Sequence, residues 1–163
     1  LFDRTVDRGM ARGKELQGDA IASQKLRDKA EAGLRQEQLL GSRGFGHRRD
    51  LARLLLEKGR SQDVAEALAL MQQEVKIRRD GVTLDILAWA LSSAGDWKGA
   101  DRVMAEIVRS GIRDAGIFYR ASAIARTLGK DAESRAYLQK AKEIDPSFDV
   151  RSRQAVGLAT DEF

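Results

Sequence analysis

Side chains that could perform chemistry are few in this sequence. His47 is the only histidine, and the chain contains no cysteine. A metal site built on histidine and cysteine needs several such ligands. A serine nucleophile needs a base and the Gly-x-Ser-x-Gly turn of hydrolases, and no such turn is present. We therefore expect no catalytic residues, no metal site and no bound cofactor.

The remaining patterns that could support catalysis are also weak. The stretch Gly44-Phe45-Gly46 is too short to cradle a phosphate, and no Gly-Lys-Ser/Thr loop occurs elsewhere. The carboxylates of Asp80 and Asp85 are better explained by a helix cap and an exposed helix face than by acid–base chemistry. The sequence thus predicts a protein that is not an enzyme.

The composition indicates an all-α protein without a membrane span. Of the 163 residues, 42% are hydrophobic and 33% are charged, and there is one proline. No apolar run approaches the roughly 20 residues that cross a bilayer, so we expect a soluble protein. The net charge of +4 is not gathered into a basic block, so nucleic acid is not the expected partner. RNA binding by a basic helical surface, suggested by the pI of 9.6, stays open as an alternative.

The elements that would position any functional side chain are predicted from two similar segments. Apolar residues spaced three and four apart precede Gly95 and Gly129, which predicts a helix with one buried face before each glycine. Glycine accepts the left-handed backbone that ends such a helix. Asp96 and Asp114 are candidate caps of the helices that follow them. The two stripes are Leu84, Leu87, Ala88 and Leu91, and Phe118, Ala121, Ala125 and Leu128.

The period of these segments resembles that of a known repeat family. Gly95 and Gly129 stand 34 residues apart, Ala100 is small where two helices would cross, and Pro146 follows the last unit. This combination resembles the tetratricopeptide repeat (TPR). The resemblance implies a right-handed α-α superhelix of helical hairpins that binds other proteins. The repeats look most similar to the C-terminal repeats of bacterial proteins, which leaves cytoplasm and periplasm both open.

The resemblance divides the chain into three parts. Three TPR-like repeats are expected at about 46–80, 81–114 and 115–148, the first irregular because of extra residues near 61–63 at its inter-helix turn. Residues 1–45 are expected to form helices over 3–16 and 19–40, either as a degenerate repeat or as a helical arm that straightens against a partner. Residues 149–163 are expected to form a capping helix, beginning near Ser147, and a tail. Because the chain begins at Leu1, it looks like part of a longer protein.

In TPR proteins the first helix of each repeat lines a concave groove in which ligands bind. Arginine forks hold carboxylates in a bidentate way, and tryptophan and tyrosine give large rigid contacts. The resemblance therefore implies a partner peptide or protein, possibly acidic. The inward-pointing candidates, together with Ile86, are Arg49, Arg53, Asp85, Trp89, Tyr119, Arg120 and Arg126.

Other interpretations of these residues remain open. Trp89 could pack between neighbouring first helices, stacked on an arginine, and Trp97 is expected in the core. The arginines could form an ordinary solvated face, where a single ion pair contributes little. The chain could also act as an assembly scaffold, by self-association or by docking to the rest of a larger parent protein.

Overall fold

The computed structural model describes residues 13–14, 18, 20–39 and 47–147. This part of the chain contains α-helices and no strand, which confirms the all-α fold class. None of its helices is long and apolar enough to cross a membrane. The helices are α2 (Ala20–Leu39), α3 (His47–Lys58), α4 (Ser61–Glu74), α5 (Gly81–Ser93), α6 (Trp97–Arg109), α7 (Ala115–Thr127) and α8 (Asp131–Ile144).

Aspartate side chains cap the N-termini of three of these helices, each from the residue just before the helix. Asp96 accepts a hydrogen bond from the backbone N–H of Gly99 at 2.8 Å, and Asp114 accepts one from Ile117 at 3.0 Å. Asp80 caps α5 in the same way. A side-chain oxygen at this position satisfies a backbone donor that has no partner inside the helix. The caps predicted at Asp96 and Asp114 are thus confirmed.

The turns between paired helices depend on glycine. Gly95 has φ of 85° and Gly129 has φ of 72°, both in the left-handed region. A side chain at such a position strains the backbone. Each glycine follows the first helix of a pair and lets the chain reverse direction within three residues, at 94–96 and 128–130.

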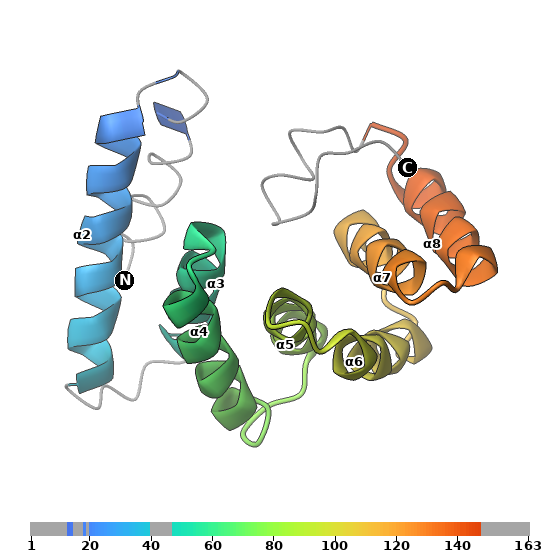
Figure 1. The fold of residues 1–163 in the computed structure, drawn as a ribbon, viewed down its shortest axis with the longest axis horizontal. Helices are drawn as coiled ribbons and strands as arrows, with labels where there is room; N and C mark the ends of the chain where they lie inside the picture. Colours follow the sequence, from blue (N-terminus) through green and yellow to red (C-terminus); the bar gives the residue numbers. More distant parts are fainter. Residues whose placement is uncertain (1–12, 15–17, 19, 40–46, 148–163) are drawn as a thin grey trace.

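Consecutive helices pair as hairpins, α3 with α4, α5 with α6 and α7 with α8, and neighbouring hairpins also touch. The second helix of one hairpin packs on the first helix of the next, α4 on α5 and α6 on α7, and α5 also contacts α3 and α7. In Figure 1 the hairpins follow one another along an arc, with α5 and α7 on its inner side and α6 and α8 outside them.

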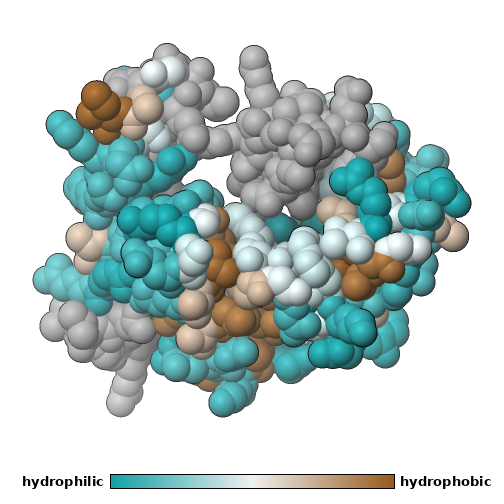
Figure 2. Space-filling view, in the orientation of Figure 1, coloured by the Kyte–Doolittle hydropathy of each residue, from teal (hydrophilic) through white to brown (hydrophobic). Residues whose placement is uncertain are grey.

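The core runs from hairpin to hairpin because α5 is buried on two faces. Ile86 and Trp89 join the cluster built on α3 and α4, whereas Leu84 and Ala88 join the cluster built on α6 and α7. Trp97 is partly buried and packs against the second cluster, somewhat more exposed than a core residue. Apolar residues gather in the middle of the view in Figure 2, over α5 and its neighbours.

Helix α2 packs against the first hairpin and agrees with the helix expected over 19–40. Its Ala30 and Leu34 are buried in the cluster of α3 and α4. Its Arg35 forms two hydrogen bonds with the carboxylate of Glu66 on α4, at 2.6 and 2.8 Å. Most of the helix expected over 3–16, the linker over 41–46 and the C-terminal segment over 149–163 lie outside the described residues.

The first hairpin differs from the expected irregular repeat in one respect. Its inter-helix turn consists of Gly59 and Arg60 and is not lengthened, because Ser61 already begins α4. The expectation of extra residues at the turn was therefore wrong. Residues 61–63 form the first turn of α4, where Asp63 is buried and accepts hydrogen bonds from Arg60.

Replacing Gly95 or Gly129 with alanine should lower the free energy of unfolding by about 1 kcal/mol each. An added Cβ would meet no atom within 4 Å at either position, so the loss would come from the backbone angle alone. Urea unfolding followed by circular dichroism measures the effect. Asparagine, which tolerates this angle better, should cost less at both positions. Unchanged stability of both alanine variants would contradict the assigned turn geometry.

Candidate functional site

The residues predicted to bind a partner lie on the first helix of each hairpin. The structure brings three of them together, Asp85 and Trp89 of α5 with Arg120 of α7. Arg120 Nε donates to Asp85 Oδ1 at 2.7 Å, and the guanidinium carbon lies 5.0 Å from the centroid of the Trp89 ring. The cation therefore pairs with a carboxylate and stacks on an indole at the same time, and the stacking agrees with the packing interpretation of Trp89.

These three side chains are largely removed from solvent. The side chain of Arg120 is 5% exposed and that of Asp85 17%, and Trp89 is 8% exposed. Burial strengthens the attraction between the charges, because little water screens them, but it also removes their hydration. The ion pair thus fixes the position of α7 against α5 and presents little free surface to a partner.

Arg49 links α3 to α5 in a similar way. Its Nη1 donates to both oxygens of Asp80, at 3.2 and 3.3 Å, and to Thr83 Oγ1 at 3.4 Å. Asp80 also accepts the cap hydrogen bond from the Thr83 backbone at 2.9 Å. One carboxylate therefore starts α5 and holds the preceding first helix beside it.

The pKa of Asp80 reflects this environment. Burial raises its pKa, but the hydrogen bonds from Thr83 and the charges of Arg49 and Arg78 outweigh burial, so the pKa lies below its ordinary value. A carboxyl group with a lowered pKa in the folded state stabilises the protein above its unfolded-state pKa. That contribution disappears as the pH falls through the folded-state pKa. The link between α3 and α5 should therefore weaken in acid.

The other predicted site residues differ in their surroundings. Tyr119 is buried in an apolar cluster with Phe118 of α7 and Ala141 of α8. Arg53 is half-buried on α3, and Arg126 is exposed on α7. Ile86 lies in the core between α5 and the first hairpin. Of the predicted arginines, Arg126 is thus the most accessible to a partner.

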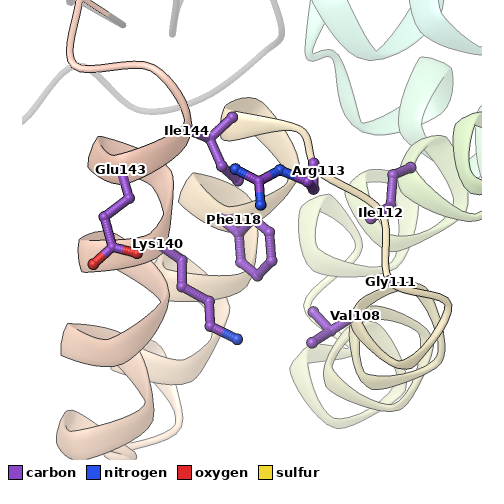
Figure 3. Close-up of a pocket in the computed structure, with 8 residues that line it drawn as sticks. All are labelled: Val108, Gly111, Ile112, Arg113, Phe118, Lys140, Glu143 and Ile144. Carbon is purple, nitrogen blue, oxygen red and sulfur yellow. The ribbon is translucent and has the colours of Figure 1, made fainter.

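Sequence reasoning missed a cavity between the end of α6 and the last turns of α8 (Figure 3). We call it the α6–α8 cavity. It holds about 240 Å³, and Phe118 of α7 lies between its two walls. Three separate helices and a loop supply its residues, so no local spacing in the sequence indicates it. The lining residues are Val108, Gly111, Ile112, Arg113, Phe118, Lys140, Glu143 and Ile144.

Within the described ranges, no group of three or more histidine, cysteine, aspartate or glutamate side chains is arranged to hold a metal ion. His47 begins α3 and is half-buried. No protein-family model matches the chain, and no match was found among curated proteins. The resemblance to TPR proteins therefore depends on the residue pattern alone.

The ion pair between Arg120 and Asp85 can be tested with a double-mutant cycle. Arg120→Ala should lower the free energy of unfolding by about 3 kcal/mol, because it leaves the Asp85 carboxylate without this partner in a mostly buried place. The two alanine substitutions should couple by more than about 1 kcal/mol in urea unfolding. The exposed pair Arg79–Glu106 is the control and should couple by less than about 0.5 kcal/mol. Equal coupling in both cycles would show that burial adds nothing.

The Asp80→Asn substitution should separate the cap from the charge. Asparagine caps helices well, so the variant should lose only a few tenths of a kcal/mol near neutral pH. Its stability should then fall less than that of the wild type as the pH drops below the ordinary aspartate pKa. Thermal melts across acidic pH measure this, with the exposed Asp131→Asn as control. Parallel pH profiles for wild type and Asp80→Asn would contradict the role given to the charge.

Proposed function

We propose that this chain is a non-enzymatic protein-interaction module, a short TPR-like right-handed solenoid that binds an acidic segment of a partner. The binding surface would be the inner wall, which we define as the inner sides of α3, α5 and α7. The proposal combines the repeat pattern of the sequence with the side-by-side placement of these three helices.

The observation that carries the proposal is the pair of polar links along the inner wall. Arg49 joins α3 to the start of α5, and Arg120 joins α7 to Asp85 in the middle of α5. These links hold three helices from different hairpins at set positions before any partner arrives. A surface ordered in advance loses less conformational entropy on binding, so more of the contact energy appears as affinity.

The predicted residues then divide into two roles. Arg120, Asp85 and Trp89 position the helices, since they are buried and in contact with one another. Arg53 and Arg126 are the more accessible cations of the same wall and would meet a partner carboxylate. Arginine suits this role because its planar fork can donate two parallel hydrogen bonds to one carboxylate.

A peptide-display selection with the whole chain tests this function. Selected peptides should be enriched in aspartate and glutamate. Arg126→Glu should weaken their binding about tenfold, because it replaces attraction by repulsion. Arg102→Glu, an equal charge change at an exposed position on α6, is the control and should keep the affinity within about twofold.

Circular dichroism and thermal melting of each variant would establish that the fold is retained. Selected peptides without acidic residues, or equal losses in the Arg126 and Arg102 variants, would refute the inner wall as the binding surface. Sedimentation across a concentration range, measured in parallel, would detect self-association and so favour the scaffold alternative.

A further inference from the structure

The α6–α8 cavity combines an apolar floor with a charged rim. Phe118 is 5% exposed and lies at its centre, and the half-buried Val108, Ile112 and Ile144 surround it (Figure 3). These side chains come from α6, the connection between α6 and α7, α7 itself and α8. They form a concave apolar surface at the junction of two hairpins, and it shares no residue with the inner wall.

Two cations border this floor. Arg113 and Lys140 are both exposed, and Lys140 Nζ lies 5.6 Å from the centroid of the Phe118 ring. No ion pair found in the described part of the chain includes either residue. In Figure 3 the Arg113 guanidinium lies near Phe118 on the other side from the Lys140 ammonium. An anionic group beside the ring could therefore pair with one of these cations on either side.

The third charged residue of the rim does not neutralise them. Glu143 accepts a hydrogen bond from Gln139 at 3.0 Å, one turn earlier on α8. Its carboxylate points away from Phe118 in Figure 3. Two cations and one carboxylate give the rim of the cavity a net positive charge, which favours an anionic occupant.

The size of the cavity narrows the class of occupant. Sites for small-molecule ligands and cofactors usually hold roughly 300–1,000 Å³. At about 240 Å³ this cavity is smaller and suits a single apolar side chain. An inorganic anion would leave the apolar floor unused, and an acyl chain would extend beyond it. A polypeptide that places an apolar side chain beside a carboxylate would use both floor and rim.

We propose that the α6–α8 cavity is a second docking site, which takes one apolar side chain of an acidic partner segment while Arg113 and Lys140 pair with the carboxylates on either side of it. The occupant is thus a protein segment with leucine, or a similar residue, next to aspartate or glutamate. The cavity shares no residue with the inner wall. Loss of binding at one site would therefore not imply loss of binding at the other.

The test uses the whole ¹⁵N-labelled chain and three capped peptides, acetyl-Gly-Asp-Leu-Glu-Gly-amide and its Asn-Leu-Gln and Asp-Gly-Glu analogues. The first peptide should shift the amide signals around Gly111–Arg113 and Lys140–Ile144. Each analogue should bind about tenfold more weakly, since one lacks the charge and the other lacks the apolar side chain.

The double substitution Arg113→Glu and Lys140→Glu should weaken binding of the first peptide by at least about tenfold. Both residues are exposed, so the fold should tolerate the change. The matched control, Arg102→Glu with Arg135→Glu, makes the same change of net charge at exposed positions of α6 and α8 and should keep the affinity within about twofold. A selective loss in the first double variant supports the site.

Three results would overturn the proposal. The glycine analogue could bind as well as the leucine peptide, which would reduce the effect to general charge attraction. Inorganic phosphate alone could cause the same shifts with equal affinity, which would indicate a simple anion site. The shifts could also map to the inner wall, which would leave the cavity without a role and assign the peptide to the surface proposed above.

Discussion

The double burial of α5 is the constraint on which the rest of this structure depends. Leu84 and Ala88 face α6 and α7, whereas Ile86 and Trp89 face the first hairpin. A hairpin consisting of α5 and α6 alone could cover only one of these faces and would leave the other in water. Burying apolar area is the main favourable term in folding. The hairpins must therefore stack, and the middle one requires a neighbour on each side.

Polar contacts then select one arrangement among the many that apolar packing would permit. Hydrophobic contacts have little direction, whereas hydrogen bonds and ion pairs require particular distances and angles. Arg120 between Asp85 and Trp89 sets α7 against α5. A smaller case is Ser134, which follows Ala100 by one period of 34 residues and stands at the crossing of α7 and α8. Its hydroxyl lies 3.0 Å from that of Ser122, so both buried hydroxyls have a partner and the helices can still approach closely.

This arrangement gives the molecule two surfaces of different character. The inner wall takes its order from polar links between successive first helices, of which the one between Arg120 and Asp85 is largely buried. Its accessible cations stand on helices that these links hold in place. The α6–α8 cavity arises where two hairpins meet at their ends, with the buried Phe118 ring between its walls. Both surfaces carry accessible cations, exposed at Arg126, Arg113 and Lys140 and half-buried at Arg53. The stack that satisfies the core thus also produces the two surfaces that we propose as docking sites for an acidic segment.

The sequence by itself determined the helices, their starts and their reversals. The caps at Asp96 and Asp114 and the turns at Gly95 and Gly129 act through atoms only a few residues apart, so a local pattern is enough to predict them. Even there, residues 61–63 were assigned to an inter-helix turn although they begin α4, because helix boundaries are the least certain part of such a pattern.

Only the tertiary structure decided which side chains meet. Arg120 and Asp85 are 35 residues apart, and their pairing depends on how far one hairpin is rotated and shifted against the next. The same rotation buries Tyr119, leaves Arg126 exposed and opens the cavity beside Phe118. The sequence contains the periodicity of each helix but not the angle between hairpins. That angle results from the packing of all the side chains at their contacts, and a small change in it moves residues between the core and the surface.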